Sequence, residues 1–209
     1  KGQSIMPKRP HRRLSAAILL AACSTAFGVD NANLPNATQE LLQMYPGTHI
    51  AQDQGRIQTI YGMPMTAGLT PRDAATLWIQ LHGEAFGVGP LTVDDLWTTP
   101  IMDGRFTVFS YRQNINGIPV EHGNLRVLVL NEPIPRVVYA AGTLAPQPKE
   151  VQARVALDGN TALAIAQAQF SAKGMNTWKA PEKVIWQGEG TWIAPVVAWH
   201  ISGYSSNPN

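Results

Sequence analysis

The residues of this chain that could carry out metal chemistry are its five histidines. A zinc peptidase places two histidines four residues apart on one helical face, with a glutamate after the first (HExxH), so that two imidazoles and a general base converge on the metal. The histidines here are scattered, and no two are four residues apart: His11, His49, His82, His122 and His200. The sequence therefore predicts no metal site and no cofactor.

Other catalytic patterns are also missing from the sequence. It contains no GxSxG nucleophile motif and no glycine-rich phosphate-binding loop. The adjacent acids Asp94 and Asp95 lie near a predicted turn, where carboxylates are normally solvated. The tryptophans are dispersed, which favours core packing and sheet edges over a sugar-binding platform: Trp78, Trp97, Trp178, Trp186, Trp192 and Trp199. We therefore expect this segment not to be an enzyme.

Composition indicates a globular chain of one or two domains, with 209 residues, 44% hydrophobic and 14% charged. The formal net charge of +2 comes from five basic residues that precede the first acidic residue, Asp30. Without them, 11 basic residues face 14 acidic ones, a net charge of −3. The basic character thus belongs to the N-terminal segment, and nucleic acid is not expected as a partner.

Residues 1–28 comprise upstream residues before Met6 and the three parts of an export signal. These parts are a basic start, an apolar run too short to span a membrane, and a small-residue stretch: 8–13, 14–22 and 23–28. Two outcomes stay open. Signal peptidase could cleave near Ala26, or Cys23, the only cysteine, could be lipidated, because residues 20–23 (LAAC) resemble a bacterial lipobox. We expect an exported protein, whether secreted, periplasmic or lipid-anchored at the cell surface, that meets the membrane only through this segment.

The segment 29–69 is predicted to contain a short helix over 39–45 and a lead-in strand over 55–65. The apolar members of that strand are Ile57, Ile60 and Met63. A longer helix follows over 70–86. Thr70 and Asp73 form a capping-box pair around Pro71, and Gly87 is the expected stop. Its predicted buried stripe is Ala74, Leu77, Trp78, Leu81, Ala85 and Phe86.

The region 105–130 (RFTVFSYRQNINGIPVEHGNLRVLVL) has the pattern of a β-hairpin. Asn116-Gly117 supplies the two positive-φ residues of a type I′ turn. Phe106 and Val108 are predicted on one side of the first strand, and Phe109, Tyr111 and Ile115 on the other, so at least one side must be covered. Further strands are predicted over 91–100, before a turn at Asp103-Gly104, and over 136–144. Packing the helix on this antiparallel sheet gives an α+β layer.

This hairpin resembles the signature of the fungalysin/thermolysin propeptide (FTP) family, an aromatic-Arg-Gln run followed by a Gly-x-Pro-Val turn. The matching residues are Tyr111, Arg112, Gln113, Asn116, Gly117, Pro119 and Val120. The resemblance extends to 55–57 and 86–88 upstream and to 141–144 downstream, about half of the chain. It defines an FTP-like domain over 70–148.

A second domain is predicted over 149–209, after a proline-rich boundary at 145–150. Its helix over 158–170 would bury Ala162, Ile165, Ala166 and Phe170, and its strands over 179–186 and 191–201 would be joined by 188–190. This order resembles the PepSY domain that follows FTP in protease proregions. The predicted fold is thus two cystatin-like/PepSY-like units. We expect the second unit to be truncated and to lack one strand. Its two strands form a single hairpin, and the turn-forming residues 203–209 lead on from that hairpin.

The resemblance implies the proregion of an exported thermolysin/fungalysin-like zinc metalloprotease, a zymogen segment that assists folding of the downstream peptidase domain and inhibits it. The partner would be that domain, located after Asn209 in the same polypeptide. The alternative is a freestanding exported or lipid-anchored binding module with the same fold, because fold does not fix function.

Overall fold

The computed structural model describes residues 34–53, 55–146, 157–171, 174–187 and 195–205. The chain divides into two units, Lys1–Asp30 and Asn31–Asn209. The first unit holds the predicted export signal and Cys23, which lie outside the described residues. In the second unit, the described residues form three α-helices and a large curled sheet of eight strands, which confirms the predicted α+β class.

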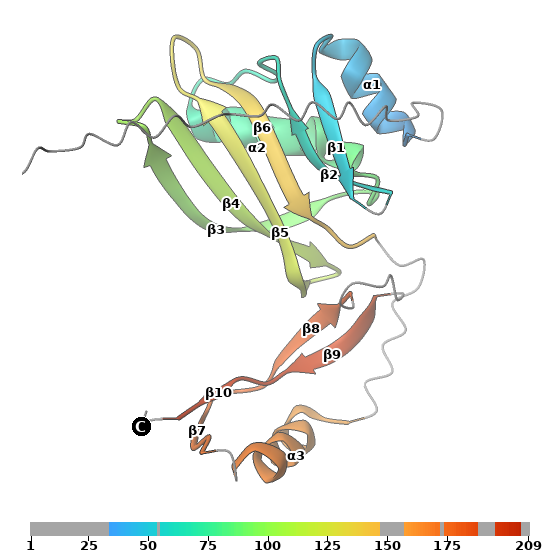
Figure 1. Ribbon diagram of the computed structural model, residues 1–209, viewed down its shortest axis with the longest axis vertical. Helices are drawn as coiled ribbons and strands as arrows, with labels where there is room; N and C mark the ends of the chain where they lie inside the picture. The colour runs from blue at the N-terminus through green and yellow to red at the C-terminus, as the bar shows by residue number, and fades with distance from the viewer. Residues whose placement is uncertain (1–33, 54, 147–156, 172–173, 188–194, 206–209) are drawn as a thin grey trace, which may run out of the picture. The chain divides into compact units, whose positions relative to one another are not determined.

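Six antiparallel strands form what we call the main sheet, in the order β1-β2-β6-β5-β4-β3 (Figure 1). The strands are β1 (His49–Asp53), β2 (Arg56–Tyr61), β3 (Thr92–Ile101), β4 (Phe106–Ile115), β5 (Ile118–Leu130) and β6 (Arg136–Thr143). The predicted hairpin is confirmed as β4 and β5, joined by Asn116 and Gly117 with φ angles of 53° and 78°. The predicted turn at Asp103-Gly104 is also present, with φ angles of 54° and 80°.

Helix α2 (Pro71–His82) lies across one face of the main sheet, and a short 3₁₀ helix, η2 (Gly83–Phe86), continues it (Figure 1). The predicted start is confirmed. Thr70 accepts from the Asp73 N–H, Asp73 accepts from the Thr70 N–H, and Pro71 occupies the first turn. Gly87 ends the 3₁₀ helix in a left-handed conformation, with φ 74°. The chain therefore carries its own start and stop signals for this helix.

The predicted buried stripe of α2 is partly wrong. Ala74, Trp78, Ala85 and Phe86 are buried as expected, but Leu77 and Leu81 are 40% and 60% exposed. The helix instead buries the opposite flank of Trp78, formed by Ala75, Ile79 and His82. Both flanks have helical spacing. The small side chain at Ala75 lets the helix axis approach the sheet, which the bulkier leucine flank would prevent.

Three corrections apply to the remaining N-terminal elements. Strand β2 ends at Tyr61, before Gly62 with φ 125°, so Met63 is 52% exposed and the prediction that it belongs to the buried side is wrong. Strand β1 was not predicted, because its polar residues lie on a sheet edge and need no apolar alternation. Helix α1 spans Asn36–Met44, three residues earlier at its start than expected.

Pro100 lies within β3 and has no backbone N–H to donate. Strand β3 is at the edge of the main sheet, where this loss is tolerated.

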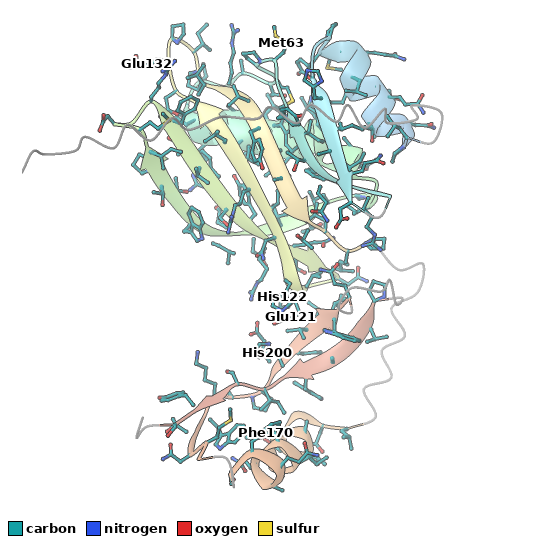
Figure 2. The ribbon with its side chains drawn as sticks, in the orientation of Figure 1. Met63, Glu121, His122, Glu132, Phe170 and His200 are labelled. Atoms are coloured by element: carbon teal, nitrogen blue, oxygen red, sulfur yellow. The ribbon has the colours of Figure 1, made fainter. Side chains whose placement is uncertain are left out.

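The C-terminal part contains α3 (Gly159–Phe170), β7 (Thr177–Trp178), β8 (Glu182–Trp186), β9 (Val196–His200) and β10 (Gly203–Tyr204). Asp158 caps α3 by accepting from the Thr161 N–H at 3.0 Å. The predicted buried side of α3, Ala162, Ile165, Ala166 and Phe170, is wrong. No residue of α3 is buried: Ile165 is 45% exposed, and Phe170, which is labelled in Figure 2, is 36% exposed. An alanine-rich helix gains little from packing, because each methyl side chain removes little apolar surface from water.

The strands of the C-terminal part pair in two places. Strand β8 pairs with β9, and it also joins the eight-stranded sheet through β5. Strand β10 pairs with β7, so the prediction that Gly203 and Tyr204 are turn-forming residues is wrong. The loop over 188–190 and most of the predicted boundary, 147–150, lie outside the described residues. None of the helices in the described ranges has the length and apolar character needed to cross a membrane.

Candidate functional site at the hairpin end

The residues that match the FTP motif lie together where β4 turns into β5. We call residues 111–123 the hairpin end. Most of these residues make structural contacts: Gln113 and Val120 are 1% and 1% exposed, and Tyr111 is 4% exposed. Asn116 and Gly117 form the turn, and Pro119 pairs with Asn114 across it. The motif therefore builds a structural junction at this end of the sheet.

Gln113 ties the hairpin to the chain that leaves β6. Its Nε2 donates to the carbonyl oxygen of Ala145 at 2.7 Å, and its Oε1 accepts from the Ala145 N–H at 2.7 Å. The side-chain amide thus pairs with both backbone groups of Ala145, as a neighbouring strand would. Both residues are buried, so no other partner is readily available for these groups.

Tyr111 lies on the helix side of β4. Its ring stacks with that of Phe109 at a centroid distance of 6.5 Å, and Phe109 in turn lies under the Arg72 guanidinium at 5.3 Å. Burial, with a smaller contribution from the Asp95 carboxylate, raises the pKa of Tyr111 to about 12. Arg72 pairs with Asp95 at 2.8 Å, although both side chains are more than half exposed. Tyr111 is therefore neutral at physiological pH and serves packing.

A bulge in β5 reorients the hairpin end. Arg112 pairs with Asn124 and Asn114 pairs with Pro119, so residues 120–123 have only Gln113 opposite them. His122 adopts a φ of 59°, which is uncommon for a residue other than glycine. Bulges of this kind bend a strand and increase its twist. At this bend β5 also pairs with β8, through a parallel bridge between Val120 and Ile185.

The contact between β5 and β8 has an apolar centre. Ile115, Val120, Ala145 and Ile185 form one buried cluster, with Ile118 packed against it. Ile185 is 0% exposed. A fully buried aliphatic side chain of this size contributes about 1.5–3 kcal/mol, so the cluster is the main source of attachment at this point.

Polar groups surround this centre. Arg112 donates to Glu182 at 3.2 Å, and Gln187 donates to the backbone oxygen of Glu121 at 3.4 Å. The carboxylate of Glu121 lies 3.1 Å from Nδ1 of His200 and 3.7 Å from Nε2 of His122 (Figure 2). Because these groups are partly exposed, each pair contributes at most about 1 kcal/mol, and they fix register more than they add stability.

This arrangement offers little for catalysis or metal binding. Within the described ranges, no three His, Cys, Asp or Glu side chains are placed to hold a metal ion. His122 and His200 share only one carboxylate. Of the predicted acidic pair, Asp94 accepts from Asn114 at 2.9 Å and Asp95 pairs with Arg72, and both are exposed. What the hairpin end can do is hold two parts of the chain together.

Two structural features were not predicted from the sequence, one at the hairpin end and one at the end of α2. The first is the bulge, for which the only local signal is Gly123, where an added Cβ would lie 2.6 Å from the Val120 side chain. The second is His82, which is buried against Tyr45 and Trp78, with ring centroids at 5.4 Å and 6.2 Å. Burial lowers the pKa of His82. Its helical spacing from Ala75, Trp78 and Ile79, which are buried on the same flank of α2, was the available signal.

Comparison of the sequence with protein-family models and with curated proteins finds no match to either.

Proposed function

We propose that this chain is the proregion of an exported thermolysin/fungalysin-like zinc metalloprotease, and that it assists the folding of the peptidase domain following Asn209 and inhibits that domain until cleavage. In this proposal, 70–148 is an FTP-like domain, a cystatin-like unit with a helix on an antiparallel sheet, and 149–209 belongs to a PepSY-like domain. Cys23 is either removed with the export signal or lipidated.

The observation that supports the proposal best is that several residues of the FTP-like motif contact other segments of the chain. Gln113 pairs with Ala145, and Val120 packs against Ile185. Arg112 pairs with Glu182. Val120 and Arg112, two of the residues that resemble the FTP signature, thus contact the segment resembling PepSY, while Gln113 ties the hairpin to Ala145 within the FTP-like domain. A tandem of two such domains, rather than a single one, is what the resemblance implies for a proregion.

The physical basis of the proposed activity is linkage. A proregion that binds only the native-like peptidase stabilises that state in proportion to its occupancy, and it blocks the substrate cleft while it stays bound. Neither effect needs a catalytic group in the proregion itself. The scattered histidines and the absence of HExxH from this sequence are compatible with that role.

The direct test is the reading frame after Asn209. We expect it to encode HExxH within a peptidase domain. A frame that ends or encodes no zinc peptidase would remove the proposal and leave the freestanding binding module. That second function is favoured by one specific observation, an exposed aromatic face on the main sheet: Tyr61, Tyr139 and Trp97 are 42%, 38% and 46% exposed.

A further inference from the structure

The main sheet has one face that no described element covers. Helix α2 packs on the side that carries Phe109, Leu125 and Val127 (Figure 1). Side chains alternate along a strand, so Val108, Arg126 and Leu128 point to the opposite side, which we call the open face. The strand register shows which residues lie next to each other there.

A largely apolar row, with the polar residues His49 and Thr99 at its two ends, crosses the open face. Its members are paired strand by strand from β1 to β3: His49, Tyr61, Tyr139, Leu128, Val108 and Thr99. The rings of His49 and Tyr61 lie 5.6 Å apart. Six strands spaced about 4.8 Å apart make this row about 24 Å long, the length of roughly seven residues of extended chain.

Cationic residues flank the row on both sides. On β5, Arg126 lies two residues before Leu128, in a neighbouring row with Ser110 and Trp97. On the other side, Arg136 pairs with Leu130, which pairs with Phe106, and Arg105 lies over the Phe106 ring at 5.5 Å. Arg105, Arg126 and Arg136 are exposed, and none forms an ion pair with a described carboxylate.

Acidic side chains are missing from these three rows. No Asp or Glu occurs at any of their paired positions, although the chain beyond its N-terminal segment is net acidic. Exposed apolar side chains grouped on one surface mark interaction sites in soluble proteins, and arginine with tyrosine and tryptophan is the composition enriched at such sites. An apolar row with unpaired arginines on both sides is complementary to a ligand that has an apolar centre and carboxylates on both sides of it.

We propose that the open face binds an extended acidic segment of a partner protein, in which aspartate or glutamate accompanies aliphatic or aromatic residues. The apolar side chains would lie on the row of Tyr61, Tyr139 and Leu128, and the carboxylates would reach Arg126 on one side and Arg105 and Arg136 on the other. This inference goes beyond the proposed proregion function, since the partner need not be a peptidase.

Two features favour a protein segment over single-stranded nucleic acid, which also combines stacking with arginine. The centre of the strip is aliphatic, at Leu128 and Val108, where bases would find no ring to stack on. Among the described residues, the exposed arginines nearest the row lie in its two flanking rows, and Arg105 already lies over Phe106. A protein segment uses both the aliphatic centre and the flanking charges.

The test is a titration of the purified chain, followed by amide chemical shifts, with an acidic peptide of about 12 residues in which Asp alternates with Leu and Phe. We expect saturable shifts at Arg126, Leu128 and Tyr139, and none on α3. The matched peptide with Lys in place of Asp should bind at least about tenfold more weakly. Raising the salt from about 0.05 M to about 0.5 M should weaken binding of the acidic peptide several-fold.

Paired variants locate the site. Arg126→Glu with Arg136→Glu should weaken binding of the acidic peptide at least about tenfold and improve binding of the lysine peptide. Lys179→Glu with Lys183→Glu changes the net charge equally, on exposed positions of the C-terminal part, and should leave both affinities within about twofold. Tyr139→Ser should weaken binding of either peptide.

Several results would overturn the proposal. Equal binding of the two peptides would show that charge plays no part, and absence of binding would show that the face has no such ligand. An oligothymidine of about 12 nucleotides that bound more tightly than the acidic peptide would assign the face to nucleic acid. Concentration-dependent dimerisation abolished by Tyr139→Ser would assign it to a second copy of this chain.

Discussion

Replacing Gln113 by alanine tests the junction at its most buried polar contact. The substitution removes both hydrogen bonds to Ala145 and leaves its N–H and carbonyl oxygen without partners in a residue that is 0% exposed. Each unsatisfied backbone group costs about 1–3 kcal/mol, and the freed side-chain entropy offsets about 1 kcal/mol. We expect Gln113→Ala to lower the free energy of unfolding by about 1–5 kcal/mol, a substantial share of a typical domain's stability.

The assay is urea denaturation followed by tryptophan fluorescence, together with hydrogen exchange at the Ala145 amide. The matched control is Gln80→Ala, on the exposed side of α2, which should change stability by less than about 0.5 kcal/mol. The Ala145 amide should exchange faster in Gln113→Ala only. A loss no larger than that of the control, with unchanged exchange, would refute the reasoning.

Gln113→Glu separates hydrogen bonding from size. At neutral pH the introduced carboxylate still accepts from the Ala145 N–H, but its second oxygen faces the Ala145 carbonyl oxygen and repels it. Protonation restores a donor at that position, so the folded state raises the pKa of the introduced carboxyl. The stability deficit relative to the parent should therefore shrink as the pH falls through that raised pKa. A deficit independent of pH would show that shape alone matters here.

Three further predictions concern separate parts of the fold. Gly117→Val should cost more than about 1 kcal/mol in urea melts and Gly117→Asn much less, because the strain comes from φ 78° and no atom lies within 4 Å of an added Cβ; equal costs would remove the turn argument. Ile185→Asp should speed amide exchange in β8 and at Val120 while leaving β2 and β6 protected. The control Ile165→Asp, on exposed α3, should leave exchange in β8 and at Val120 unchanged. Continued protection of β8 in Ile185→Asp would contradict the assigned cluster. Burial lowers the pKa of His82 in the folded state. The contribution of His82 to stability is therefore present above its unfolded-state pKa of about 6.5 and is lost as the pH falls through the lowered folded-state pKa, so His82→Gln should flatten the acid-side decline of Tm. A decline of Tm parallel to that of the parent would show that His82 is not the group responsible.

Local signals in the sequence predict much of the main sheet. The Thr70–Asp73 capping box and the Asn116-Gly117 turn each depend on residues close together in the chain, and the structure confirms both. Strand β1 gave no such signal, because an edge strand of polar residues is stabilised by its partner rather than by burial.

The remaining errors come from tertiary packing. The face that α2 buries depends on how closely Ala75 lets it approach the sheet, and both flanks of Trp78 have suitable spacing. The motif residues were predicted as a set, but their contacts were not. The pairing of Gln113 with Ala145 spans 32 residues, and the packing of Val120 on Ile185 follows from a bulge that only the folded hairpin reveals.

The proregion proposal is tested most directly by refolding, from denaturant, the peptidase domain that the proposal places after Asn209, with and without this chain added in trans, and following peptide hydrolysis. The account predicts recovery of native peptidase only when the chain is present, followed by inhibition that saturates near one chain per peptidase and is relieved when the chain is cleaved. Equal recovery of fully active peptidase in both samples, with no inhibition at an excess of the chain, would contradict it.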